Sequence, residues 1–143
     1  MSGRRLIDML ILHEGKRHHV YKCSEGYETI GCGRNISESG LGLSDGEIDF
    51  LLRNDLMRVQ SELAANVPCY EKLSEPRQAV LMDMCFNLGI SRFLQFQKML
   101  TALEMEEYAE AAKEMLDSKW ARQVGKRSVR LAEMMHGDRW PQA

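Results

Sequence analysis

The first clear hydrophobic period runs through residues 4–13. Four residues recur there at i, i+3, i+4 and i+7 spacing: the apolar Leu6, Met9 and Leu10, and then His13. This spacing places them on one face of a helix, and Gly15 is well placed to end that helix. We therefore expect a first helix with Glu14 at its C-terminal end.

The pattern then changes to that of extended strands. Residues 18–23 and 27–32 are rich in β-branched and aromatic side chains, and they flank the tripeptide Ser24-Glu25-Gly26. Such a connection predicts an antiparallel hairpin with a three-residue turn. In that register residue 23 pairs with 27 and residue 21 with 29. One face of a short two- or three-stranded sheet then carries Tyr21, Cys23, Tyr27 and Thr29.

A loop rich in Gly and Ser follows, and the rest of the pattern is helical. Residues 44–47 form a capping box, SDGE, and the broad apolar face of residues 45–65 predicts a long helix. A central buried helix is expected from the Ser74 cap, with Pro76 in its first turn, to Gly89. Shorter helices are expected over about 91–103, 105–117 and 127–136, the last ended by Gly137.

Strands near the N-terminus and helices elsewhere indicate a mainly helical α+β fold. The chain has 143 residues, which is the size of a single domain. No stretch of about 18 uncharged apolar residues is present to cross a membrane. Residues 1–15 lack a signal-peptide cleavage site, so we expect synthesis without a signal peptide.

Charge and cysteine content narrow the function classes only in part. The net charge is −2, but the segment from Lys119 to Arg130 is basic and contains no acid. That segment predicts either a solvated helix face or a surface for an anionic polymer. The cysteines form no C-x-x-C pair, and the histidines form no recognisable zinc pattern. We expect reduced thiols, no metal site and no cofactor.

Glu14, Cys23 and Thr29 form the candidate site. Cys23 and Thr29 are diagonal neighbours on the predicted hairpin, with backbones about 7 to 8 Å apart, and Glu14 enters from the end of the first helix. An acid, a potential nucleophile or base, and a hydroxyl that can hold a water converge there. A lone glutamate is usually a surface residue and a lone cysteine a buried hydrophobe. Their joint spacing favours a hydrolytic site instead.

Residues 12–33, LHEGKRHHVYKCSEGYETIGCG, resemble the N-terminal catalytic segment of the bacteriophage-type lysozymes, or endolysins. The pattern of that family is Glu, eight residues, Asp or Cys, five residues, Thr, and Glu14, Cys23 and Thr29 fit it. Residues 86–89, FNLG, resemble the exit of the family's central helix. Residues 118–140 resemble its C-terminal segment, so the resemblance covers nearly the whole chain.

The resemblance implies a muramidase that hydrolyses the β-1,4 bond between N-acetylmuramic acid and N-acetylglucosamine in peptidoglycan. It implies one lysozyme-like domain, residues 1–143, with the substrate in a cleft between two lobes. A small sheet lobe, about 14–44, is joined by the long helix to a helical lobe, about 66–143, on which residues 1–13 are expected to pack.

The resemblance also implies roles for individual residues. Glu14 takes the general-acid position, and Thr29 orients the attacking water or supports the second catalytic group. Arg127 matches an arginine that contacts the catalytic glutamate. Arg127 and Phe86 are therefore expected to bind substrate or to support the site.

Cys23 stands at the second catalytic position, where most glycosidases use a carboxylate. A thiol with an ordinary pKa of about 8.5 is ionised only to a few per cent at neutral pH. Two roles stay open. Lys16, Lys22 or Arg127 could lower the pKa of Cys23 and make a thiolate base available. Alternatively, the sulfur could attack the sugar and form a thioglycosyl intermediate; we favour this nucleophilic role.

Three features depart from the family pattern. Arg34 stands where the family commonly has histidine, so a different supporting interaction is expected in the small lobe. The connection from Asn35 to Ser44 is shorter than in many relatives. Phe96 stands where relatives often have a small polar residue. These departures bear on substrate subsites more than on the reaction.

Two alternatives to an enzyme stay open. One is a peptidoglycan-binding module with a degenerate site, and the other is a lysozyme-like component of a phage particle. For the enzyme, the resemblance implies lysis of a bacterial host by a protein made in the host cytoplasm. A holin-type pore would give it access to peptidoglycan glycan strands. We expect a monomer, without a nucleic-acid partner and without stable membrane insertion.

Overall fold

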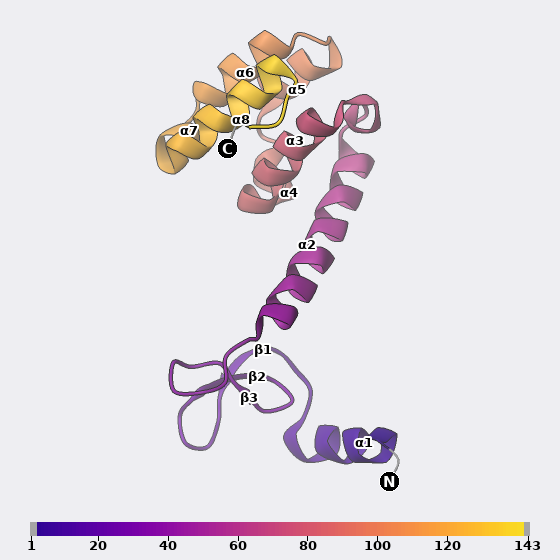
Figure 1. Cartoon of the computed structure of the whole chain (residues 1–143), viewed down its shortest axis with the longest axis vertical. Helices are drawn as coiled ribbons and strands as arrows, with labels where there is room; N and C mark the ends of the chain where they lie inside the picture. The colour runs from indigo at the N-terminus through magenta and orange to yellow at the C-terminus, as the bar shows by residue number, and fades with distance from the viewer. Residues whose placement is uncertain (1–2, 142–143) are drawn as a thin grey trace. The chain divides into compact units, whose positions relative to one another are not determined.

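The computed structural model describes residues 3–141 of the chain. Two compact units are present, and they divide between Leu51 and Leu52 (Figure 1). Within the described residues there are eight α-helices, one short 3-10 helix and one three-stranded antiparallel sheet. The mainly helical α+β fold that the sequence predicts is therefore confirmed. No helix between residues 3 and 141 is long and apolar enough to cross a membrane.

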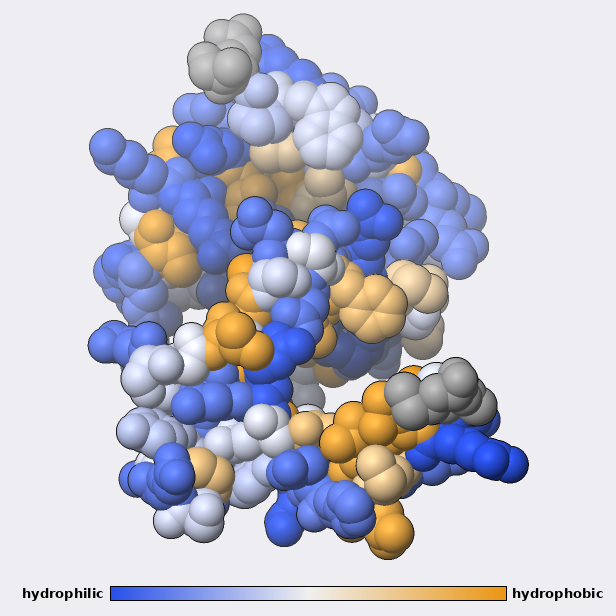
Figure 2. Space-filling view, turned by 60° about the horizontal axis from the view of Figure 1, so that its bottom comes forward, coloured by the Kyte–Doolittle hydropathy of each residue, from blue (hydrophilic) through white to orange (hydrophobic). Residues whose placement is uncertain are grey.

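The first unit opens with helix α1, Gly3–Glu14. The helix ends where predicted, because Gly15 adopts a left-handed conformation with φ +79° and its N–H donates to the carbonyl of Ile11 at 2.8 Å. None of the described residues of α1 is buried, and Figure 2 shows hydrophobic side chains gathered over this helix. The packing of residues 1–13 on the helical lobe stays a prediction.

The sheet of the first unit follows the predicted hairpin register. Its three strands lie side by side in the order in which they follow along the chain. Tyr21 pairs with Thr29, and the N–H of Cys23 donates to the carbonyl of Tyr27 at 3.0 Å. Cys23, Tyr27 and Thr29 therefore occupy the predicted positions around the turn. The strands are β1 (Arg17–Lys22), β2 (Glu28–Gly31) and β3 (Arg34–Asn35).

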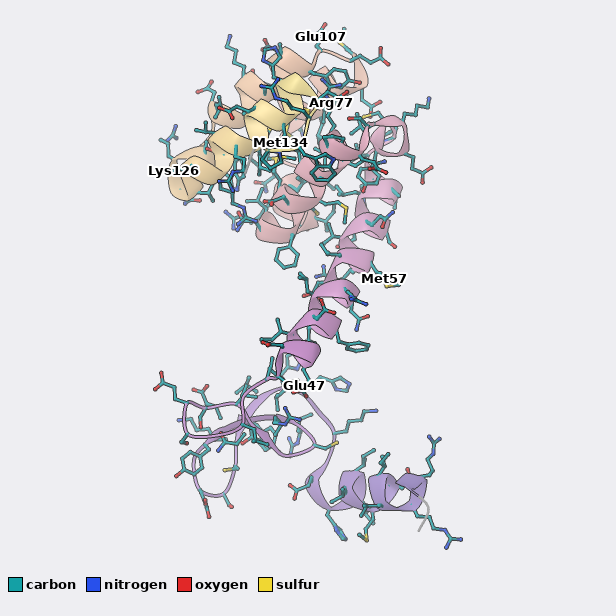
Figure 3. The ribbon with its side chains drawn as sticks, in the orientation of Figure 1. Glu47, Met57, Arg77, Glu107, Lys126 and Met134 are labelled. Carbon is teal, nitrogen blue, oxygen red and sulfur yellow. The ribbon has the colours of Figure 1, made fainter. Side chains whose placement is uncertain are left out.

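Arg34 links β3 to the start of helix α2, Asp45–Asn66. Its Nη1 donates to the carbonyl of Gly42 at 3.0 Å and to Oε1 of Glu47 at 2.8 Å. Glu47 also closes the predicted capping box: its Oε1 accepts from the N–H of Ser44 at 2.9 Å, and its own N–H donates to Ser44 Oγ at 3.2 Å. Figure 3 labels Glu47 at this first turn of α2. In this chain Arg34 therefore supports the small unit through an ion pair with Glu47.

The Arg34–Glu47 pair makes the stability of the first unit depend on acid pH. Hydrogen bonding to Arg34 lowers the pKa of Glu47 from 4.5 to about 2. The stabilisation is therefore complete above pH 4.5 and is lost as the pH falls toward 2. We expect Glu47→Gln, which can keep the capping box, to lower the melting temperature at pH 6 and to have little effect near pH 2.

Far-UV circular dichroism across this pH range measures the effect. Glu38→Gln is the control, because it removes the same charge from an exposed position in the preceding loop. An equal effect of Glu47→Gln at both pH values would contradict the prediction.

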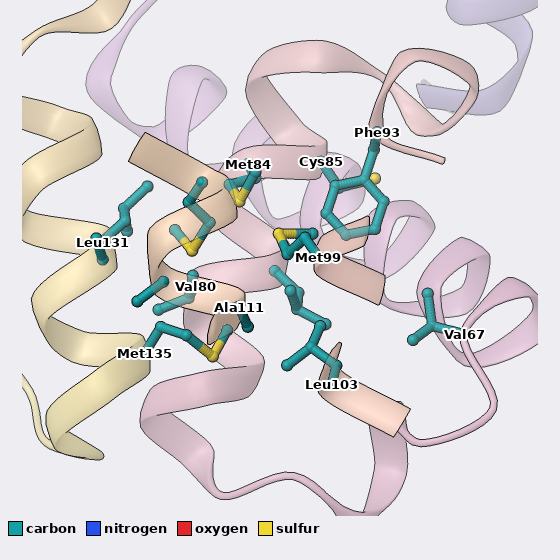
Figure 4. Close-up of a cluster of buried hydrophobic side chains, with 14 of the residues drawn as sticks. Val67, Val80, Met84, Cys85, Phe93, Met99, Leu103, Ala111, Leu131 and Met135 are labelled. Atoms are coloured by element: carbon teal, nitrogen blue, oxygen red, sulfur yellow. The ribbon is translucent and has the colours of Figure 1, made fainter. Parts of the chain in front are cut away.

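The second unit is a helical bundle whose core is formed around helix α3, Glu75–Leu88. Val80, Leu81 and Met84 of α3 are 0% exposed, which confirms the predicted central buried helix. Figure 4 shows Met84 and Cys85 in one cluster with residues of the later helices. The elements are η1 (Tyr70–Lys72), α3 (Glu75–Leu88), α4 (Ile90–Phe93), α5 (Gln97–Glu104), α6 (Tyr108–Leu116), α7 (Lys119–Val124) and α8 (Lys126–Gly137).

Two of the helices predicted in this unit have different bounds in the structure, and one further helix was not predicted. The helix expected over 91–103 is interrupted at residues 94–96, where Phe96 turns its ring edge-on to Trp120 at a centroid distance of 6.1 Å. The helix expected over 105–117 begins at Tyr108, because Glu106 has a left-handed φ of +59°. A further helix, α7, precedes the one expected at 127; Ser118 caps it by accepting from the N–H of Ala121 at 3.1 Å.

Candidate active site

Glu14 is the last residue of α1, and its side chain is exposed. Its carboxyl group lies against the backbone of the turn between β2 and β3. A Cβ atom placed on Gly33 in that turn would be 2.9 Å from Glu14 Oε2. Helix α1 thus places the carboxyl group of Glu14, the predicted general acid, at the turn between β2 and β3.

Cys23 and Thr29 are brought together by the turn of the first hairpin. Cys23 is half-buried, whereas Thr29 is only 2% exposed. The N–H of Cys23 and the hydroxyl of Thr29 both donate to the carbonyl of Tyr27, at 3.0 and 2.8 Å. The backbone of Cys23 and the side chain of Thr29, two of the three predicted catalytic residues, therefore share one carbonyl partner.

The pKa of the Cys23 thiol is lowered in this environment. The main causes are hydrogen bonds with the backbone of Tyr27 and then of Glu25. Burial acts in the opposite direction and raises the pKa, and the Thr29 hydroxyl makes a smaller contribution that lowers it. Lys16 and Lys22, two cations considered from the sequence, are not among the causes. Because N–H groups and a hydroxyl stabilise the thiolate, the turn itself makes Cys23 easier to ionise.

Thr29 has a single hydroxyl proton to share between two acceptors. That proton is directed to the Tyr27 carbonyl at 2.8 Å, yet the same hydroxyl contributes to lowering the pKa of Cys23. The two hydrogen bonds exclude each other. Donation to Tyr27 fits the neutral thiol, and donation to sulfur fits the thiolate.

Replacing Thr29 with valine is therefore expected to raise the pKa of Cys23. The hydroxyl that stabilises the thiolate is removed, while the Tyr27 carbonyl keeps the N–H of Cys23 as a donor. The pH midpoint of Cys23 alkylation by iodoacetamide, followed by mass spectrometry, should move upward. Thr101→Val, at an exposed position of α5, is the matched control. An unchanged midpoint in Thr29→Val would show that the hydroxyl does not act on the sulfur.

Arg127 and Phe86 lie in the second unit, on α8 and α3. Arg127 Nε donates to Oδ1 of Asp83 at 2.7 Å, and Phe86, 43% exposed, follows Asp83 by three residues on α3. Residues at this spacing are neighbours on a helix surface, so Phe86 is a neighbour of Asp83, the partner of Arg127. The contact of Arg127 with Glu14 stays a prediction.

Two neighbours of the predicted site residues were not predicted from the sequence: Gly33, which lies against Glu14, and Asp83, which pairs with Arg127. Gly33 lies inside the segment that resembles the family, and a glycine there can also mark a close approach of backbone to another group. The ion pair of Asp83 carries no local signal, because its partner is far along the chain. No group of three or more His, Cys, Asp or Glu in the described residues is placed to hold a metal ion.

Chemically, the first unit presents a carboxyl group that can give a proton and a sulfur that ionises more easily than an ordinary thiol. Both are carried by one small sheet and the helix that leads into it. These two groups can carry out a displacement in which the carboxyl group protonates the leaving oxygen and the sulfur acts as nucleophile or base.

Comparison with known proteins connects the site to a family. A family model described as phage lysozyme matches residues 12–134. Two proteins of Dictyostelium discoideum, probable T4-type lysozymes 1 and 2, are each 29% identical to the chain. The alignments cover 90% and 88% of the chain, and 91% and 90% of those proteins.

A third relative is a structural protein. The pre-baseplate central spike protein Gp5 of Enterobacteria phage T4 is 27% identical over 152 residues. That alignment covers 88% of the chain and 26% of the spike protein.

Proposed function

The chain belongs to the phage lysozyme family, and from this premise we propose that it is a muramidase. It hydrolyses the β-1,4 bond between N-acetylmuramic acid and N-acetylglucosamine in bacterial peptidoglycan. The observation that carries the proposal is the presence in one unit of the exposed Glu14 carboxyl, held against the turn at Gly33, and of the Cys23 thiol of lowered pKa beside Thr29. The two relatives named as probable T4-type lysozymes support the same reaction class.

Glu14 is the general acid of the proposed reaction. Its carboxyl proton passes to the glycosidic oxygen as the bond from C1 to that oxygen breaks, which spares the leaving sugar from departing as an alkoxide. A positioned acid of this kind contributes about 10²- to 10⁴-fold to the rate.

Cys23 acts on C1 of the same sugar, and we propose that it does so as a nucleophile. The thiolate attacks C1 while the C1–O bond breaks, and a thioglycosyl intermediate forms. Water, losing a proton to the Glu14 carboxylate, then displaces the sulfur as thiolate. Lowering a thiol's pKa weakens it as a base more than as a nucleophile, since nucleophilicity follows pKa with a slope of only about 0.4 to 0.5.

Thr29 supports this chemistry from a buried position. Its hydroxyl can donate to the Cys23 thiolate before attack and again when the sulfur leaves as thiolate. In the second candidate role, with Cys23 as a base, the same hydroxyl would orient the attacking water. Arg127 and Phe86 are proposed as supporting or substrate-binding residues.

Product analysis of digested cell walls tests the proposed reaction. Mass spectrometry is expected to find fragments that end in a reducing N-acetylmuramic acid, and release of reducing ends should rise with time. Proton NMR of the first product reports the anomeric configuration: retention is expected for a covalent intermediate. Inversion would assign Cys23 to the role of base and leave the muramidase proposal intact.

A second candidate function is suggested by the spike protein of phage T4, because the chain aligns with only 26% of the spike protein's length. In that case the chain would be a wall-binding or structural lysozyme-like module. It would bind purified walls without releasing reducing ends, so the same assay separates the two functions.

The biological role we propose is lysis of a bacterial host, in which a holin-type pore gives the protein access to the wall. Family membership is the support for this step. Cells that express the protein are expected to stay intact until their membrane is permeabilised, and then to lyse. Turbidity measured with and without a permeabilising agent tests the proposal; lysis at the same rate in both would contradict the need for a pore.

A further inference from the structure

Gly33 lies in the turn between β2 and β3, directly against the side chain of Glu14. A Cβ atom built on Gly33 would be 2.9 Å from Oε2, 3.2 Å from Cδ and 3.5 Å from Cγ of Glu14. Ordinary contacts of a Cβ atom begin at 3.4 Å. Any side chain at Gly33 would therefore displace the carboxyl group by about 0.5 Å or more.

Gly31 is a comparison residue that distinguishes the effect of this contact from the effect of backbone strain. Gly31 and Gly33 both have a left-handed backbone, with φ of +70° and +85°, which side chains rarely adopt. A Cβ on Gly31, however, would have nothing within 4 Å. The two glycines share the conformational demand, and of the two only Gly33 borders the Glu14 carboxyl.

We infer that Gly33 is a positioning residue for Glu14: its bare backbone sets where the carboxyl group rests. The inference rests on the proposed function, in which Glu14 is the general acid. Glu14 ends α1 and is exposed, so its flexible side chain needs a surface to define its position. Proton transfer requires an approach of about 2.6 to 3.2 Å, and a misplacement of about 1 Å can cost about 100-fold in rate.

The displaced group is the far end of a flexible side chain, so the carboxyl can move without unfolding the protein. A methyl group at residue 33 should therefore affect catalysis more than stability. This separates a positioning role from a purely structural one.

The first test compares Gly33→Ala with Gly31→Ala in a peptidoglycan hydrolysis assay. Both variants should lose stability, because alanine disfavours positive φ, and both are assayed at a temperature at which circular dichroism shows them folded. We expect kcat of Gly33→Ala to fall by about 10- to 100-fold with KM changed by less than about 2-fold. Gly31→Ala should keep kcat within about 3-fold of the wild type.

The second test is a double-mutant cycle with Glu14→Asp. The shorter side chain draws the carboxyl away from residue 33, so a methyl group there has less to displace. If the contact is direct, the loss in Gly33→Ala/Glu14→Asp is smaller than the product of the two single losses. With Gly31→Ala in place of Gly33→Ala, the losses should multiply.

Equal losses of kcat in Gly33→Ala and Gly31→Ala, or multiplicative losses in both cycles, would overturn the inference without touching the proposed function. If Gly33→Ala does not fold, Gly33→Asn and Gly31→Asn carry the same comparison, since asparagine tolerates positive φ better. The proposed function fails separately, if the wild-type protein releases no reducing ends from cell walls.

Discussion

Glu14→Gln is expected to lower the rate of peptidoglycan hydrolysis by at least about 100-fold. Glutamine has nearly the shape of glutamate, so it can occupy the same place against Gly33. Its amide cannot give a proton to the glycosidic oxygen, and the leaving sugar would then depart as an alkoxide. Release of reducing ends from purified walls, measured at saturating substrate, gives the change in kcat.

The same substitution should leave the fold unchanged. Glu14 is exposed, and surface substitutions usually alter the free energy of unfolding by no more than about 0.5 kcal/mol. Glu38→Gln, which neutralises an exposed carboxyl elsewhere in the first unit, is the matched control and should keep wild-type activity. A Glu14→Gln variant that hydrolyses walls at an undiminished rate would remove Glu14 from the general-acid role.

Substitutions of Cys23 should have the second largest effect. Cys23→Ala removes the group that acts on C1 and is expected to lower activity by about 100-fold or more. Cys23→Asp is expected to restore much of it, because a carboxylate is ionised at neutral pH and can act as base or nucleophile. Hydrolysis rates of the two variants, measured side by side, test the prediction.

Cys69 offers a matched control for the thiol. Burial raises the pKa of Cys69 to about 11, so this thiol stays protonated at neutral pH and iodoacetamide should spare it. Cys69→Ala should keep wild-type activity and should still be inactivated by iodoacetamide. Equal activity of Cys23→Ala and Cys23→Asp, whether high or low, would argue against a catalytic role for an ionisable group at residue 23.

Several elements were predictable because neighbouring residues decide them. Gly15 ends α1 through its own left-handed backbone, and Ser44 and Glu47 cap α2 across three residues. The three-residue turn sets the pairing of Tyr21 with Thr29. These interactions are short in sequence, so their residue types are visible in a local pattern.

The interruption at residues 94–96 shows where local patterns fail. No glycine or proline marks it in the sequence. Phe93 is 0% exposed, and Phe96 packs edge-on to Trp120. Packing of these two large rings outweighs the modest helix propensity of the residues between them.

The cause of the lowered pKa at Cys23 was also hidden from the sequence. The charged neighbours Lys16 and Lys22 were visible along the chain, but the groups that act are the backbone of Tyr27 and Glu25 and the hydroxyl of Thr29. Every residue has a backbone N–H, so only the conformation of the turn tells which of them face the sulfur.

Residue types at short and regular intervals were enough to predict the fold class, the family and the spacing that brings Cys23 beside Thr29. What holds the reactive groups in place became visible only in the folded chain. Folding set the carboxyl of Glu14 against Gly33, joined Arg34 to Glu47 and paired Arg127 with Asp83. Such contacts join segments that are separated along the chain, and their distances are defined only once the intervening backbone has folded.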